Sequence, residues 1–133
     1  MKLKKIAIYC HVFVFIVGIQ IVFRTIKLKQ IEPMLEFKHF ERKAFIFREL
    51  NEIQASRIIK RLSTFIFKKN LCIIQSITLK HMLNKMSIES KICLGLKKES
   101  DNLIAHAWVE IQNMPLFFLD KKQFEFTKVK EIS

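Results

Sequence analysis

The sequence has few of the residues that break helices or build long loops. Gly and Pro occur only twice each in 133 residues. This scarcity excludes a loop-rich sandwich, a collagen-like chain and a flexible linker. The cysteines number three and form no Cys-x-x-Cys pair: Cys10, Cys72 and Cys93. An odd and widely spaced set argues against a disulfide framework and a structural zinc site, and it fits a reducing compartment.

Acidic residues are also scarce. The chain has 24 Lys and Arg against 12 Asp and Glu, and the excess is concentrated in residues 1–70, which hold 15 basic residues and 5 acidic ones. Such a basic half is expected to attract an acidic partner, whether a peptide, a phosphate or a lipid headgroup. Half of the residues are apolar, so a chain of this length can bury the core of one domain.

An apolar run occupies residues 6–23. His11, Gly18 and Gln20 interrupt it, and basic residues flank both of its ends. The run is just long enough for a bilayer, which requires roughly 20 residues. Basic flanks on both sides give no orientation, and without an Ala-x-Ala site a cleaved signal peptide is not expected. A spanning helix, a helix buried in protein and a helix on a membrane surface all stay open. Pro33 predicts the end of this helix.

Periodicity predicts the remaining elements. A helix capped by Asn51 extends to residues 68–70, and a second, from Asn70 to Met86, is apolar around most of its circumference and therefore central. The period then changes to two, which predicts strands at 91–97, 103–111, 115–119 and 123–129. The fold class is therefore α+β, with N-terminal helices followed by a small antiparallel sheet connected as a meander. Residues 1–50 form the apolar helix and a connector, and residues 51–133 form the core.

One cysteine has a position suited to nucleophilic chemistry. A reactive thiol needs a lowered pKa, which the first turn of a helix can supply, and Cys72 has that position in the pattern. Cys10 lies within the apolar run and Cys93 lies in the middle of a strand. The alternative for any of the three is a small buried hydrophobic residue.

Such a thiol also needs an imidazole to take and return its proton. His81 lies on the Cys72 helix, more than two turns away, so it cannot reach the thiol, while His11 and His39 belong to the N-terminal segments. His106, in the second predicted strand, is therefore the candidate base.

The strand of His106 also carries an aromatic residue and a carboxylate. His106, Trp108 and Glu110 share one face, and the small and aliphatic residues of the other face are expected to pack on the core. Asp120 ends the next short strand, where a cross-strand neighbour can orient the imidazole. Glu110 is the alternative orienting residue.

The segment from Asn70 to Glu110 contains CIIQSITLKHMLNKMSIESKICLGLKK followed, after a short turn, by AHAWVE. It resembles the leader peptidases of lasso-peptide biosynthesis, which have a transglutaminase-like, papain-like cysteine-protease core. The resemblance covers residues 51–133. It implies that Cys72 is the nucleophile, His106 the base and Asp120 the acidic member of a triad, and that no cofactor or metal takes part.

The resemblance also implies partners. The substrate is the leader region of a ribosomally made precursor peptide, delivered by a separate leader-binding protein, and a macrocyclase acts on the product. The expected location is the cytoplasm, with residues 6–23 packed on the core or in contact with a membrane surface. No nucleic-acid partner is expected, because no RNA-binding signature is visible.

Two other functions use the same observations. A transglutaminase-like acyl transferase would need the same three residues, and a basic membrane-associated protein without catalysis would need none of them. A metal site of Cys72, His106 and Cys93 is disfavoured, because the ligand spacing does not match the common zinc sites.

Overall fold

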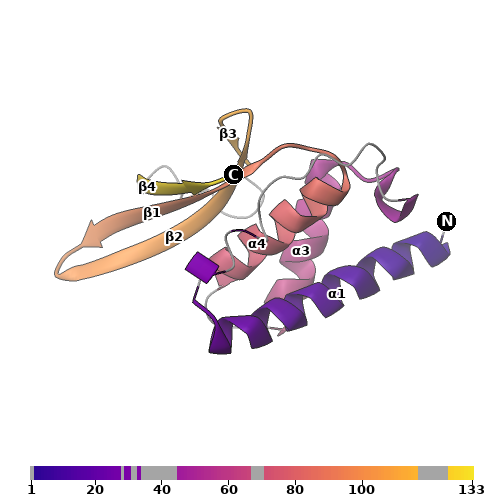
Figure 1. The fold of residues 1–133 in the computed structure, drawn as a ribbon, viewed down its shortest axis with the longest axis horizontal. Coiled ribbons are helices and arrows are strands. Elements are labelled where there is room, and N and C mark those ends of the chain that lie inside the picture. Colours follow the sequence, from indigo (N-terminus) through magenta and orange to yellow (C-terminus); the bar gives the residue numbers. More distant parts are fainter. Residues whose placement is uncertain (1, 28, 31–32, 34–44, 67–70, 117–125) are drawn as a thin grey trace.

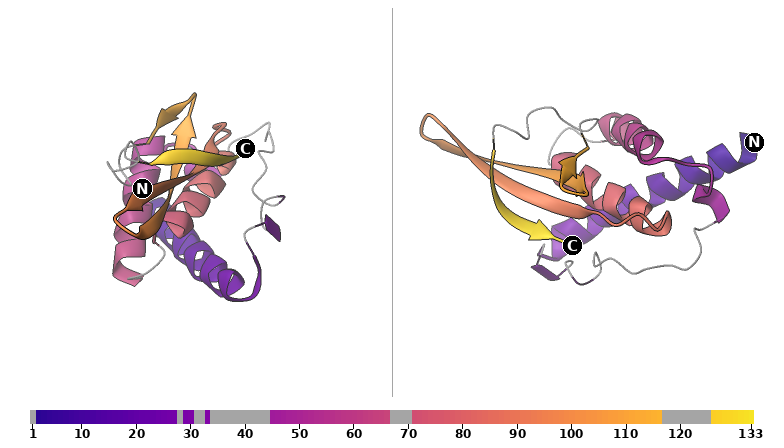
Figure 2. Two further views of the ribbon diagram at one scale, coloured as in Figure 1. Left: turned by 90° about the vertical axis from the view of Figure 1, so that its left-hand side faces the viewer. Right: turned by 90° about the horizontal axis from the view of Figure 1, so that it is seen from above.

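The computed structural model describes residues 2–27, 29–30, 33, 45–66, 71–116 and 126–133. Along this part of the chain the helices precede the strands, so the α+β fold class is confirmed. The helices lie together and the sheet lies beside them, with its long hairpin extending past the helices (Figure 1 and Figure 2). The elements are α1 (Lys2–Thr25), η1 (Phe45–Phe47), α3 (Glu52–Ile66), α4 (Leu71–Lys85), β1 (Lys91–Glu99), β2 (Asn102–Ile111), β3 (Met114–Pro115) and β4 (Thr127–Ile132).

The first helix ends earlier than the sequence predicts. α1 ends at Thr25, well before Pro33, so the prediction that this proline ends the helix was wrong. The Thr25 hydroxyl donates to the carbonyl of Val22 at 3.1 Å, and the Lys27 amide donates to the side-chain oxygen of Gln30 at 3.2 Å. The Val22 carbonyl still accepts the helical bond from the Ile26 amide at 2.8 Å, whereas the Lys27 amide, which a continuing helix would use for itself, donates to a side chain, and this ends the helix locally.

α3 begins at the predicted cap. The Gln54 amide donates to Asn51 Oδ1 at 2.8 Å, and the Asn51 amide donates to Gln54 Oε1 at 3.2 Å, which is a reciprocal capping box. The predicted end of this helix at residues 68–70, and the predicted cap Asn70 of the next one, lie outside the described residues.

α4 is the central helix that the sequence predicts. Every residue from 74 to 80 is buried. The helix contacts α1 and α3 on its flanks and β1 and β2 of the sheet. Even Lys80 is buried, where its ammonium donates to the carbonyl of Ser90. Any side chain in the first turn of α4 is therefore held by a helix that cannot shift without disturbing the whole core.

The sheet is antiparallel, with strand order β3-β2-β1-β4. β1 and β2 form the hairpin, with Lys91 opposite Glu110 at one end and Glu99 opposite Asn102 at the other. A turn with positive φ at Gln112 and Asn113 then leads into β3, between the predicted strands at 103–111 and 115–119.

β4 differs from the expectation in both place and extent. It pairs with β1, with Ile132 opposite Ile92, so the predicted meander is wrong. It spans Thr127–Ile132 rather than residues 123–129, and β3 is limited to Met114–Pro115. The remainder of the predicted strand at 115–119 extends into residues outside the described part. Pairing with β1 satisfies the free edge of that strand and buries Ile132 in the core, which favours this order.

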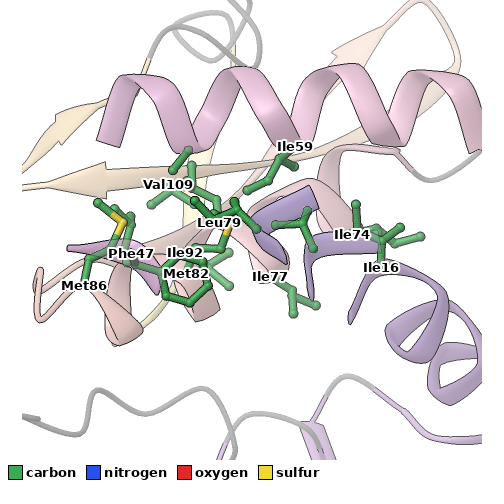
Figure 3. Packing of buried hydrophobic residues seen from close by; sticks show 14 of the residues in the cluster. Ile16, Phe47, Ile59, Ile74, Ile77, Leu79, Met82, Met86, Ile92 and Val109 are labelled. Carbon is green, nitrogen blue, oxygen red and sulfur yellow. The ribbon is translucent and has the colours of Figure 1, made fainter. Parts of the chain in front are cut away.

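One hydrophobic core joins the helices to one face of the sheet (Figure 3). Ile92 and Val109 of the sheet pack against residues of α4, and α1 and α3 close the cluster from the other side. The residues labelled in Figure 3 are Ile16, Phe47, Ile59, Ile74, Ile77, Leu79, Met82, Met86, Ile92 and Val109. We call the face of the sheet that carries Ile92 and Val109, and that packs against the helices, the inner face.

Candidate active site

Cys72 is the second residue of α4, in its first turn, as predicted. Its side chain is half-buried and is not in a disulfide. Its carbonyl accepts a hydrogen bond from the Ser76 hydroxyl at 2.7 Å. The amides in the first turn of a helix have no partner within the helix, so they can stabilise negative charge that develops nearby. Cys10 is exposed on α1 and Cys93 is buried in β1, so neither shares this environment.

His106 lies on the opposite face of the sheet from Val109, together with Trp108 and Glu110, as the alternation predicts. We call this the outer face of the sheet; its members are Lys91, Cys93, Gly95, His106, Trp108, Glu110, Lys128 and Glu131. The alternation of residues did not predict that this face is buried as well. In the structure His106, Trp108 and Glu110 are each at most 9% exposed.

Aromatic rings surround the imidazole of His106. Its ring centroid lies 5.0 Å from that of Phe126 and 6.0 Å from that of Trp108, with the Trp108 ring inclined by 21°. The stacked Trp108 ring and the Phe126 ring, tilted by 34°, restrict the rotation of the imidazole, and a base must be held in one orientation to work.

Gly95 makes room for this stack. It lies directly opposite His106 in the β1–β2 pairing. A Cβ at Gly95 would lie 2.8 Å from the Trp108 ring and 2.9 Å from the Phe126 Cβ. The sequence signal for this feature is a glycine inside a strand, which often marks a close approach of another group.

A network of charges fixes Glu110 beside Trp108. Glu110 Oε1 accepts from the Trp108 indole N–H at 2.9 Å, and Glu110 Oε2 accepts from Lys128 Nζ at 2.9 Å. Lys91 and Lys128 each also lie 2.9 Å from Glu131. Burial pushes the pKa of Glu110 upward, but the hydrogen bonds from Lys128 and Trp108 outweigh it and leave that pKa lowered. The pKa of Lys128 rises for the matching reason, its hydrogen bonds to Glu110 and Glu131.

Cys93 adjoins this network. Burial, with the negative charge of Glu110 next in importance, raises the pKa of its thiol to about 12. Cys93, Glu110 and Glu131 have donor atoms within 4.8 Å of one another, which is close enough to hold a cation. Two ammonium groups already neutralise both carboxylates, however, and the thiol stays protonated, so this arrangement is a salt-bridge network.

The two central residues of the predicted triad approach the sheet from different sides. α4, which carries Cys72, covers the inner face, while the His106 ring lies on the outer face. Within residues 71–116, no hydrogen bond joins the Cys72 thiol to the His106 ring. β3 pairs with β2 only at Glu110 and Ile111, so in the described part of the chain the edge of β2 next to His106 is not paired with β3. Asp120 lies outside the described residues, and the triad stays a prediction.

Glu110, the alternative orienting residue, has partners of its own. Its two carboxylate oxygens are bonded to Trp108 and Lys128. Its role here is to hold the indole that stacks on His106. Sequence reasoning missed Phe126, Lys128 and Glu131, because β4 was expected beside β3 and not beside β1.

His11 and His81, which the sequence analysis excluded as the base for Cys72, are in contact in the structure. Their Nε2 atoms lie 3.3 Å apart, and the His81 ring stacks on Phe15 with centroids 3.9 Å apart. Burial, then His11 and Lys85, lower the pKa of His81 to about 4. This pair joins α1 to α4 and is not part of the outer face.

Two grooves in the described residues lie away from Cys72 and His106. One, of about 580 Å³, lies at the end of the sheet, where Glu110, Asn113 and Ser133 contribute to its lining. The other, of about 480 Å³, lies between α1 and α3; its charged lining residues are Lys4, Lys5, Arg57, Arg61 and Glu49, and Glu49 pairs with Lys4 at 3.1 Å, which leaves an excess of positive charge. The second has the charge that an acidic ligand requires.

Comparison with protein families matches residues 14–129 to the transglutaminase-like superfamily. No curated protein and no solved structure gave a match. The family match begins inside α1, so it includes the second half of that helix as well as the predicted core of residues 51–133. The boundary drawn at residue 50 is not tested by this match and stays a prediction. With a central helix that carries a cysteine in its first turn, an antiparallel sheet that carries a histidine, and this match over most of its length, the chain belongs to the transglutaminase-like superfamily.

Proposed function

We propose that the protein is a cysteine peptidase that removes the leader peptide from a lasso-peptide precursor. The observation that carries the proposal is a half-buried Cys72 in the first turn of the central helix of a transglutaminase-like chain, next to a sheet with a ring-stacked His106. Enzymes of this superfamily type use a thiolate–imidazole pair for acyl transfer, so a hydrolase or a transferase is the coarser conclusion.

The reaction has two steps. The Cys72 thiolate attacks the scissile carbonyl, a C–S bond forms, and the C–N bond breaks as His106 protonates the leaving amine. Water then attacks the thioester, His106 takes its proton, and the thiolate and the peptide acid are released. The Cys72 amide, in the first turn of α4, is the candidate donor to the developing oxyanion. Asp120 would hold the imidazole in the productive tautomer.

The two side chains would meet around the edge of β2. That edge is paired with β3 only at Glu110 and Ile111, and α4 contacts the same strand from the inner face. Because α4 is fixed in the core, the groups that would have to move on substrate binding are the side chains of Cys72 and His106, and catalytic hydrogen bonds commonly tighten only when substrate is bound.

Leader binding fits the groove between α1 and α3. Its apolar lining residues, which include Ile8 and Ile58, suit hydrophobic side chains, and its excess of basic over acidic lining residues suits acidic ones. We propose that the leader, or the separate leader-binding protein that delivers it in the cytoplasm, contacts this groove, and that a macrocyclase takes the cleaved product. Arg61→Gln together with the adjacent exposed Lys60→Gln should weaken precursor binding and flatten its salt dependence. An unchanged salt dependence would contradict this part of the proposal.

The first test is limiting iodoacetamide modification across pH, with mass spectrometry to locate the label. Cys72 should react well below pH 8, His106→Ala should abolish that reactivity, and exposed Cys10 is the internal control for an ordinary thiol. Equal reactivity of Cys72 and Cys10 would mean that the isolated chain has no formed nucleophile. Cleavage of a precursor peptide, with and without the leader-binding protein, then tests the substrate.

The acyl-transfer alternative has a distinct product. Release of ammonia from a glutamine peptide in the presence of an amine, without precursor cleavage, would establish a transferase in place of the peptidase. Loss of both activities in Cys72→Ser would show that one nucleophile serves whichever reaction is found.

A further inference from the structure

The outward side of α1 is apolar and open. The large side chains along it expose between 46% and 83% of their surface. They recur at multiples of a helical turn, so they share one side of the helix, with exposed Cys10 among them. We call this set the α1 stripe; its members are Leu3, Ile6, Phe13, Val14 and Ile21.

The opposite side of the same helix holds α1 to the protein. Ile8, Val12 and Ile16 are spaced by four residues and are buried in the common core. At about 100° per residue, this buried set and the α1 stripe lie on opposite sides of the helix. Figure 1 shows α1 along the outside of the helices, running the length of their layer. α1 is therefore docked along one side and presents an apolar surface on the other.

Basic residues lie at both ends of this surface. Lys2 and Lys5 are exposed at the start of α1, and Arg24 and Lys27 are exposed at and just beyond its end. The first acidic residue of the sequence is Glu32. An apolar stripe between cationic ends matches a bilayer that contains anionic lipids, whose hydrocarbon accepts the stripe while the headgroups attract the cations.

The packing of α1 decides between lying on a bilayer and crossing it. α1 is the one helix of the described residues that is long and apolar enough to cross, a test that core helices and signal sequences also pass. α3 contacts α1 and carries exposed Arg57, Lys60 and Arg61. If α1 crossed the bilayer, α3 and α4 would have to lose their contacts with it or enter the hydrocarbon with it, and the charged residues of these helices make entry unfavourable.

We infer that the α1 stripe binds the surface of an anionic lipid bilayer, with the helix axis in the membrane plane. This inference goes beyond the proposed function and does not depend on Cys72. It would hold the protein at a membrane by the side of α1 that faces away from the sheet and its candidate site.

Flotation of the full chain with vesicles tests the inference. We expect it to float with phosphatidylcholine vesicles that contain phosphatidylserine, and to float less as salt is raised. Val14→Glu, at the centre of the stripe, should lower the bound fraction by about tenfold. Leu103→Glu is the matched control, because Leu103 and Val14 are both 68% exposed, but Leu103 lies on the distant β1–β2 hairpin. Its binding should be unchanged.

A probe at Cys10 reports the depth of insertion. A fluorophore attached there in a Cys72→Ala background should shift to the blue on vesicles, and shallow lipid quenchers should affect it more than deep ones. Stronger quenching at the bilayer centre would overturn the in-plane arrangement. Equal flotation of the two Glu variants would overturn the assignment to the α1 stripe. No flotation of the wild-type chain, whether or not sedimentation reveals a dimer, would overturn the inference altogether.

Discussion

The two faces of the sheet are both buried, but different forces cover them. On the inner face, Ile92 and Val109 are fully buried among apolar side chains of the helices. On the outer face, Glu110 and Trp108 are each 5% exposed, and hydrogen bonds and ion pairs occupy their polar atoms. Burial of apolar surface stabilises a fold directly. A buried carboxylate loses its hydration, and its hydrogen bonds and ion pairs must first compensate for that loss. The inner face therefore holds the fold together, and the outer face mainly fixes the surroundings of His106.

The inner face should be the more costly one to disturb. Ile92→Ala removes a fully buried side chain at the centre of the core and should lower the free energy of unfolding by about 2–5 kcal/mol. Urea unfolding followed by circular dichroism measures it. Val129→Ala is the control, since Val129 in β4 is 57% exposed and should change the same quantity by less than about 0.5 kcal/mol. Equal losses would mean that the inner face does not dominate stability.

On the outer face, the next largest loss of stability is expected at Gly95, where the side chains of Trp108 and Phe126 leave no room for a Cβ. Gly95→Ala places a methyl group against the Trp108 ring and should cost about 1–3 kcal/mol of stability. Trp108 is the single tryptophan of the chain, so a shift of its emission reports the displacement directly. Because the indole stacks on His106, the proposed peptidase activity should fall as well.

Gly18→Ala provides the contrasting control for that experiment. A Cβ at Gly18 meets nothing within 4 Å, and the position is inside α1. The substitution should stabilise the protein by roughly 0.5–1 kcal/mol, because alanine loses less conformational freedom in a helix. Unchanged tryptophan emission in Gly95→Ala would show that the outer face can absorb the methyl group.

Glu110→Gln tests the charge on the outer face at nearly constant shape. It leaves buried Trp108 with a weaker acceptor and Lys128 without one of its anions, so we expect a loss of about 1–3 kcal/mol near neutral pH. The pKa of Glu110 is lowered in the folded protein, so its contribution is present above the unfolded value, near 4.5, and is lost as pH falls through the folded value. The variant should therefore lose less stability than the wild type on acidification. Exposed Glu99→Gln should not show this difference.

The sequence predicts the inner face better than the outer one, and the reason is physical. Hydrophobic periodicity is a local signal, so it identifies α3, α4 and the β1–β2 hairpin together with the cap at Asn51. Both Cys72 and His106 occupy the elements expected of them. The outer face depends on β4 crossing to the free edge of β1, and no local pattern encodes which edge a strand will join. Phe126, Lys128 and Glu131 were missed for that reason.

A further, half-buried contact, between His11 of α1 and His81 of α4, should depend on pH. The pKa of His81 is lowered to about 4 by burial and by the neighbouring cations His11 and Lys85. Because the folded value lies below the ordinary 6.5, the folded state is fully stabilised above pH 6.5 and loses this contribution as pH falls towards 4. Urea midpoints between pH 7 and pH 4.5 should decline, and His81→Phe, which can keep the stack on Phe15, should reduce the decline. Parallel curves would assign the decline to other groups.

The smallest effect should come from the exposed end of the charge network. Glu131 accepts from Lys91 and Lys128 at 2.9 Å, the same distance at which Glu110 accepts from Lys128, yet its side chain is 41% exposed against 6% for Glu110. Water and salt screen exposed ion pairs, so Glu131→Gln should cost less stability than Glu110→Gln, and 1 M NaCl should remove most of that cost. The larger loss in Glu110→Gln should persist in salt, because burial limits screening. Equal losses with equal salt sensitivity would mean that pairing distance, and not burial, sets the strength of this network.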